Sequence, residues 1–145
     1  TSYKFGGVHQ HTPEIEECLA NISEQNVKIS FTPILAPMPR GILATVTSKL
    51  IGQSNIEDLR DKFEKFYENS KFVKLLPVGS LPSTSSVFGS NSAHIQIAVD
   101  SHVNRLIVSC AIDNLGKGAA GQAIQNANII CGLPDDFGLD QIGIR

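Results

Sequence analysis

Five short runs, alternating or rich in β-branched residues, predict five β-strands in this chain. The runs cover residues 27–35, 42–50, 72–78, 93–99 and 106–112. Pro33 gives the first run an edge or irregular place, because proline brings no backbone N–H to the ladder. Residues 100–104 join the last two runs as a hairpin, and the Ser-, Gly- and Pro-rich residues 79–91 form a long loop.

Apolar residues spaced three and four apart predict three helices. Thr12 caps the first, which runs to about residue 25 with Pro13 at its first position. Ser54 and Glu57 open the second as a capping box. The apolar face of this helix carries Ile56, Leu59, Phe63 and Phe66. The third runs from residue 118 to about 131. Since strands and helices do not alternate regularly, we expect an α+β fold, with a mixed, mostly antiparallel sheet and helices on one face.

The composition indicates an ordinary globular domain. The 145 residues are 41% hydrophobic and 18% charged, with a net charge of −2. A net negative charge does not favour binding to nucleic acid or to an anionic membrane. No apolar run is long enough to span a bilayer. Without a signal peptide and with an odd number of cysteines, we expect a cytoplasmic protein. Its reduced, buried thiols are Cys18, Cys110 and Cys131.

The first candidate chemistry lies at His9 and His11, two positions apart, with Glu14 opening the helix that follows. An imidazole beside a carboxylate is a typical general acid/base near neutral pH. The plainer alternative is a pair of structural histidines. A metal site is not expected, because His94 and His102 are far from this pair and have no cysteine or carboxylate at ligand spacing.

Three motifs together resemble the N-acetyl-gamma-glutamyl-phosphate reductase family. They are H-x-H-x-P-E-I at residues 9–15, F-T-P-x-L-x-P-M-x-R-G-I-L-A-T at residues 31–45 and D-N-L-x-K-G-A-A-G-Q-A at residues 113–123. The resemblance implies an oxidoreductase of arginine biosynthesis, and thus of amino-acid biosynthesis. Such an enzyme reduces N-acetyl-gamma-glutamyl phosphate to N-acetyl-glutamate semialdehyde with NADPH, through a cysteine thioester. It also implies a domain like the C-terminal domain of glyceraldehyde-3-phosphate dehydrogenase.

Two parts of the family pattern are missing from this sequence, namely the Gly-rich dinucleotide-binding turn and the motif of the nucleophilic cysteine. The chain therefore resembles the C-terminal portion of the enzyme, either an excised domain or a proteolytic fragment. We expect it to be inactive alone, with NADP(H) bound mainly by the absent N-terminal domain. Residues 1–112 would form a substrate-binding, catalytic and dimerisation domain, incomplete at its start. Residues 113–145 would form a helical segment that packs on the absent domain.

The resemblance also implies roles for single residues. His9 would be the acid/base beside the reactive sulfur, with Glu14 orienting it, and His11 would face the substrate. Arg40 would bind the substrate carboxylate or phosphate, because a guanidinium grips such groups with two hydrogen bonds. The alternative for Arg40 is a surface arginine near a strand end.

The third motif would face the cofactor through Asn114, Lys117, Gly118 and Gly121, the asparagine meeting the nicotinamide carboxamide. The alternative is a tight packing motif between helix and sheet. We expect His9, Arg40 and Asn114 to lie around one cleft, in a homo-oligomer that is a dimer or a tetramer. Two other functions stay open: a non-catalytic oligomerisation module, and the sister aspartate-semialdehyde dehydrogenase.

Overall fold

The computed structural model describes residues 1–140 and 143, and the chain folds as two compact units, Thr1–Met38 and Pro39–Arg145. The first unit contains one helix, α1 (His11–Ser23), and an isolated antiparallel bridge between Ser2 and Ile34. The predicted strand at residues 27–35 is wrong. Pro33 withholds a donor, and within this unit only the backbone near Ser2 pairs with the segment.

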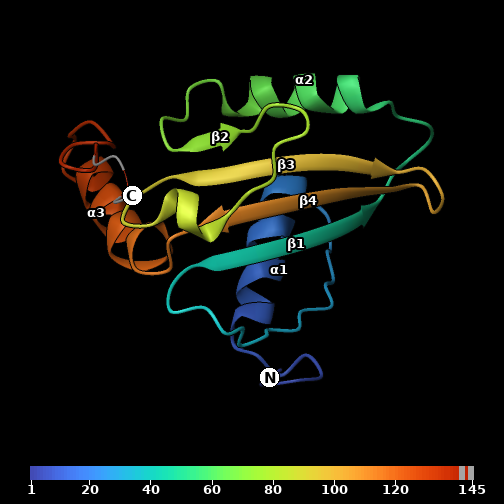
Figure 1. Cartoon of the computed structure of the whole chain (residues 1–145), viewed down its shortest axis with the longest axis horizontal. Helices are drawn as coiled ribbons and strands as arrows, with labels where there is room; N and C mark the ends of the chain where they lie inside the picture. Colours follow the sequence, from blue (N-terminus) through green and yellow to red (C-terminus); the bar gives the residue numbers. More distant parts are fainter. Residues whose placement is uncertain (141–142, 144–145) are drawn as a thin grey trace. The chain divides into compact units, whose positions relative to one another are not determined.

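The second unit is built on a four-stranded sheet with the order β1-β4-β3-β2. The strands are β1 (Ile42–Lys49), β2 (Val73–Leu75), β3 (Ala93–Asp100) and β4 (Arg105–Ile112). β4 pairs antiparallel with both β1 and β3, whereas β2 runs parallel to β3. The structure thus confirms the mixed, mostly antiparallel sheet and four of the five predicted strands (Figure 1).

The core of this unit forms where helix α2 (Ile56–Tyr67) packs along β2 and β3 (Figure 1). Leu59 from the helix and Ile95 and Ile97 from β3 are its buried centre. The helical spacing placed Phe66 on the apolar face, but its side chain is 71% exposed and Tyr67 packs on the core instead. A tyrosine ring provides the same kind of apolar contact area as a phenylalanine ring, so either residue type can fill this place.

The N-terminus of α2 is capped by Asn55, one residue later than the predicted capping box. The Asn55 side chain accepts a hydrogen bond from the backbone N–H of Asp58 at 2.7 Å. Asparagine is as good an N-cap as serine, so the predicted cap at Ser54 is wrong by one position.

The last predicted helix begins earlier than expected and in a different form. A π-helical turn, η2 (Gly116–Ala120), precedes helix α3 (Gly121–Ile130), and a short 3₁₀ helix, η1 (Thr84–Val87), interrupts the predicted loop. The π turn is closed by bonds from Gly118 N–H to Asp113 C=O and from Ala120 N–H to Leu115 C=O. Such turns occur frequently at functional sites.

The cysteines differ from the expectation. Cys18 and Cys131 are exposed, and only Cys110 on β4 is half-buried, where burial raises the pKa of its thiol. None of the described helices is long and apolar enough to cross a membrane. Among the residues that the structure describes, no cluster of three or more His, Cys, Asp or Glu side chains could hold a metal ion.

Candidate functional site

The two compact units contribute separate groups of candidate residues. In the first unit, His9 lies two residues before the start of α1 and is only 6% exposed. The rings of Tyr3 and Phe31 pack edge-on against its imidazole, with centroids 5.5 and 5.2 Å away. The imidazole is thus held among aromatic side chains, which fix its orientation.

His9 also explains where α1 begins. Its Nδ1 accepts a hydrogen bond from the backbone N–H of His11 at 3.1 Å, so the ring satisfies one of the free donors of the first turn. The predicted cap at Thr12 is wrong, because the helix starts at His11 and Thr12 lies inside it. Pro13 therefore stands at the third helical position, where its missing N–H is still not needed.

The same hydrogen bond selects the protonation state of His9. With Nδ1 acting as an acceptor, the neutral ring carries its proton on Nε2. Burial, followed by the nearby His11 and Lys4, lowers the pKa of His9, and Glu14 opposes this weakly. The ring is consequently neutral at pH 7.

Glu14 lies beside His11 rather than beside His9. One of its carboxylate oxygens is 3.9 Å from Nε2 of His11, and both side chains are largely exposed. The two imidazoles are in edge contact, with centroids 4.7 Å apart. The three predicted residues of this motif are therefore neighbours, but the carboxylate faces the second histidine.

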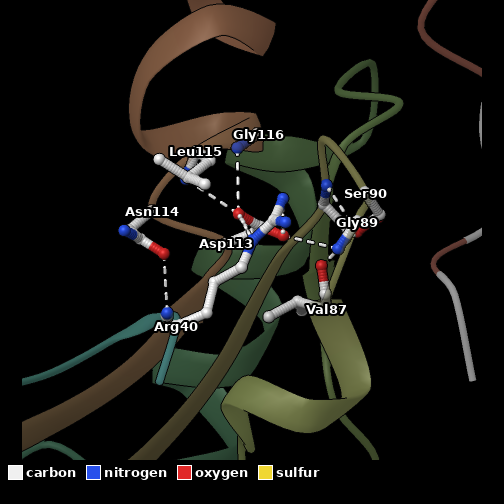
Figure 2. Close-up of polar contacts among 10 residues, drawn as sticks. Arg40, Val87, Gly89, Ser90, Asp113, Asn114, Leu115 and Gly116 are labelled. Carbon is white, nitrogen blue, oxygen red and sulfur yellow. Dashed lines mark hydrogen bonds and ion pairs between the residues drawn. The ribbon is translucent and has the colours of Figure 1, made fainter. Parts of the chain in front are cut away.

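In the second unit, the central feature is the fully buried carboxylate of Asp113, at the end of β4 (Figure 2). Its oxygens accept hydrogen bonds from the backbone N–H groups of Leu115 at 2.8 Å, Gly116 at 2.9 Å and Gly89. Burial alone would raise the pKa of Asp113, but the hydrogen bonds from Arg40 and these N–H groups hold that pKa well below its usual range. The carboxylate is therefore ionised at any ordinary pH.

Arg40 supplies the counter-charge. Its Nε donates to one Asp113 oxygen at 3.0 Å, and its Nη2 lies 2.8 Å from the other, so the pair is bidentate. The guanidinium carbon also lies 4.6 Å from the ring centre of Phe88. The Arg40 side chain, which was predicted to bind substrate, is 28% exposed. Asp113 occupies one edge of its guanidinium.

Asn114 adds a second link between the same two segments. Its Oδ1 accepts a hydrogen bond from the backbone N–H of Gly41 at 2.7 Å (Figure 2). The amide nitrogen of Asn114 then points a donor away from this bond, and a donor is what a carboxamide oxygen requires. The contact of this residue with a nicotinamide stays a prediction.

Lys117 is directed toward the protein instead. Its Nζ donates to Gln125 Oε1 at 2.7 Å and lies 5.5 Å from the ring centre of Phe72. Gln125 in turn donates to Asp135 at 2.9 Å. Burial lowers the pKa of Lys117, and Asp135 partly offsets this.

The glycines of the third motif lie in tight contacts. A Cβ on Gly121 would collide with the side chain of Asn91, and a Cβ on Gly118 would lie 3.2 Å from the Asp113 carbonyl oxygen. Asn91 is itself buried, and its Oδ1 has no hydrogen-bond partner among the described residues. These contacts favour the packing alternative for the glycines, whereas a cofactor role for them stays a prediction.

The sequence analysis missed the central place of Asp113. The signal that could have found it is local, because an aspartate in a turn commonly accepts hydrogen bonds from the N–H groups two and three residues on, which here belong to Leu115 and Gly116. Its pairing with Arg40, 73 residues away, has no such local signal. The expectation that His9 and Arg40 face one cleft stays a prediction, since they belong to different units.

Comparisons with known proteins point in one direction. The sequence model of the semialdehyde dehydrogenase dimerisation domain matches residues 1–114. The chain is 47% identical over 143 residues to an N-acetyl-gamma-glutamyl-phosphate reductase of Geobacter sulfurreducens. It is 51% identical over 142 residues to a protein with the same name in an Arthrobacter species. The matches cover 99% and 98% of this chain but 41% of each relative, so the chain spans about two fifths of their length.

A solved structure shares the fold. The crystal structure of aspartate semialdehyde dehydrogenase II from Vibrio cholerae superposes with a TM-score of 0.68 at 18% sequence identity. The match covers 85% of this chain and 37% of that one. At this identity the likeness confirms the predicted architecture and carries nothing about the substrate.

Proposed function

Because this chain belongs to the semialdehyde dehydrogenase family, whose dimerisation domain it matches, we propose that it is the C-terminal part of an N-acetyl-gamma-glutamyl-phosphate reductase. The observation that carries the proposal is the level of identity, near 50%, to relatives of that name over almost the whole chain. The enzyme would convert the acyl phosphate to N-acetyl-glutamate semialdehyde, and a cysteine outside this chain would form the thioester. The sister aspartate-semialdehyde activity has no comparable support.

His9 is the proposed acid/base of this reaction. Its buried, fixed ring and its neutral state suit a group that exchanges a proton at neutral pH. While Nδ1 accepts from the N–H of His11, Nε2 carries the proton and can only donate a hydrogen bond. To accept a proton at Nε2, the ring would first give up this bond and carry its proton on Nδ1. His11 would face the substrate, and Glu14 would act on the pair through its contact with His11.

Arg40 would contribute the N–H groups that Asp113 leaves free to an anionic part of the substrate. Asn114 is the residue that best fits NADPH, and Lys117, Gly118 and Gly121 would shape the same side of the site. The cofactor, bound mainly by the dinucleotide-binding part, would supply the hydride. This chain's residues would place the carboxamide and the substrate relative to each other.

We also propose that residues 113–145 pack on that dinucleotide-binding part, whereas residues 1–112 bind substrate and form the homo-oligomer. The family match ends at residue 114 and so supports a boundary there. Helix α3 turns Asn128 inward and leaves three large apolar side chains exposed, as expected for a helix that lacks a partner. They are Ile124, Ile129 and Ile130. The three free cysteines support a cytoplasmic location.

The test is reconstitution. The purified chain would be mixed with the dinucleotide-binding part of the Geobacter sulfurreducens relative, and the phosphate-dependent reduction of NADP by the semialdehyde would be followed. We expect turnover in the mixture, none in either part alone, and its loss with His9→Ala. The control His102→Ala, on the β3–β4 hairpin, should keep full activity.

Two outcomes would contradict the proposal. Turnover by the chain alone would place the nucleophile and cofactor site within it. Correct folding and association of both parts without turnover would instead favour the non-catalytic oligomerisation module.

A further inference from the structure

Asp113 lies where three separate segments of the second unit meet. Its carboxylate binds Arg40 from the segment before β1, the N–H of Gly89 from the loop after η1, and the N–H groups of Leu115 and Gly116 (Figure 2). A single buried charge therefore fixes all three segments. Removal of that carboxylate would leave both a guanidinium and three backbone donors without their acceptor.

The segments at residues 40–41 and 113–114 are joined twice, residue by residue. Arg40 pairs with Asp113, and the N–H of Gly41 pairs with the side chain of Asn114. Under the proposed function, Arg40 meets the substrate and Asn114 meets the cofactor. The two links therefore hold a substrate-facing residue and a cofactor-facing residue as one unit.

The state of Arg40 strengthens this interpretation. Its positive charge is compensated at hydrogen-bond distance by a carboxylate that stays ionised, so the pair is electrically neutral as a whole. The field that a distant anion experiences is consequently much weaker than that of a free arginine. The ring of Phe88 covers one side of the guanidinium and restricts it further.

We propose that Asp113 is a positioning residue of the reaction, which locks Arg40 and Asn114 together so that substrate and cofactor are aligned by one shared contact. This inference rests on the proposed function. It assigns to Arg40 mainly the task of holding geometry, through the planar fork of its guanidinium, and only secondarily that of attracting the anion by charge.

The first experiment needs no activity and uses the 145-residue chain. Backbone amide hydrogen exchange would be measured by NMR in the wild type and in Asp113→Asn, where an amide replaces one carboxylate oxygen and directs N–H groups at other donors. Asparagine keeps one acceptor oxygen, which suits the N–H groups of Leu115 and Gly116, so the amide of Gly89 should exchange at least tenfold faster. The informative amide is Gly41, whose acceptor is Asn114 rather than Asp113, and it should accelerate equally.

Unchanged protection of Gly41 in this variant would overturn the coupling. The matched control is Asp136→Asn, which removes the partner of Lys71 in a more exposed ion pair and should leave these four amides unchanged. If Asp113→Asn does not fold, Arg40→Lys serves instead. This variant keeps the positive charge but loses the bidentate contact with Asp113, so the amide of Gly41 should again exchange faster.

The second experiment uses the enzyme assembled with the dinucleotide-binding part. We expect Asp113→Asn and Arg40→Lys each to raise KM for the semialdehyde and for NADP by similar factors, at least fivefold, and the double variant to be no worse than either single one. A rise in KM for the semialdehyde without a rise in KM for NADP would overturn the proposal, because Arg40 would then act only as a substrate contact. Inactivity of the wild-type assembly would refute the proposed function, whereas the exchange result would still decide the coupling.

Discussion

At the scale of single residues, the chain shows how far a side chain's task depends on partners distant in sequence. Arg40 has the chemistry of an anion-binding residue, yet much of its hydrogen-bonding capacity is directed at Asp113. His9 similarly has the chemistry of an acid/base, and its Nδ1 is directed at the start of its own helix. In both side chains, only the nitrogen atoms that are not bonded within the protein remain for an outside ligand.

The first residue-scale prediction concerns stability. Arg40→Ala should lower the free energy of unfolding by about 3 kcal/mol, because it leaves the buried charge of Asp113 without a counter-charge. Urea denaturation followed by circular dichroism would measure this. Lys71→Ala is the control, since its more exposed pair with Asp136 should contribute much less to the free energy of unfolding. Equal losses in the two variants would contradict the prediction.

A second residue-scale prediction concerns pH. The folded state lowers the pKa of His9, so below the ordinary value of about 6.5 the unfolded chain binds the proton more readily than the folded chain does. The contribution of His9 to stability is therefore complete above that pH and decreases as the pH falls. Unfolding free energies of the wild type and His9→Asn, compared between pH 7.5 and pH 5, should converge as the pH falls. A difference independent of pH would show that His9 titrates normally.

At the scale of elements, the ends of the helices are set by side chains that the sequence pattern located only approximately. Asn55→Ala should cost about 1 kcal/mol, because it removes the acceptor for the N–H of Asp58. Ser54→Ala should cost only a few tenths of that. Thermal unfolding of both variants would decide, and the reverse ranking would restore the capping box predicted from Ser54 and Glu57.

The sequence predicted elements well where the pattern of burial is local. β3 and β4 alternate because one face meets α2, and Ile95 and Ile97 lie on that face as expected. The pattern failed where two residues compete for one place, as with Phe66 and Tyr67. It failed also at residues 27–35, where alternation was present but a partner strand was not.

The candidate site was predictable only in part, for the same physical reason. The resemblance identified the residue types, and the structure shows Asn114 bonded to the N–H of Gly41 and His9 buried, while their roles in the reaction stay predictions. It could not reveal that Glu14 faces His11, because that contact requires the helix to include His11, so that the two side chains lie three positions apart on one helical face. The pairing of Arg40 with Asp113 is a tertiary contact that no spacing rule encodes.

At the scale of the whole molecule, helix α3 gives a testable surface. Ile130 is 85% exposed, so Ile130→Asp should leave the unfolding free energy of the chain unchanged within about 0.5 kcal/mol. Under the proposed function, the same change should weaken association with the dinucleotide-binding part at least tenfold. Asn126→Asp, which adds the same charge at another exposed position of α3, is the control. Equal affinities of both variants in titration calorimetry would exclude this surface of α3 from the contact.

Arg40 and Asp113 are 73 positions apart in the sequence, and this separation also affects the order in which the protein forms its contacts during folding. Closing so long a loop is entropically slow, whereas the β3–β4 hairpin closes over four intervening residues. The ion pair should thus be absent from the rate-limiting barrier. Loss of Arg40 would then accelerate unfolding and leave the refolding rate almost unaltered. The ion pair between Arg40 and Asp113 therefore determines the lifetime of the native state rather than the rate at which it forms.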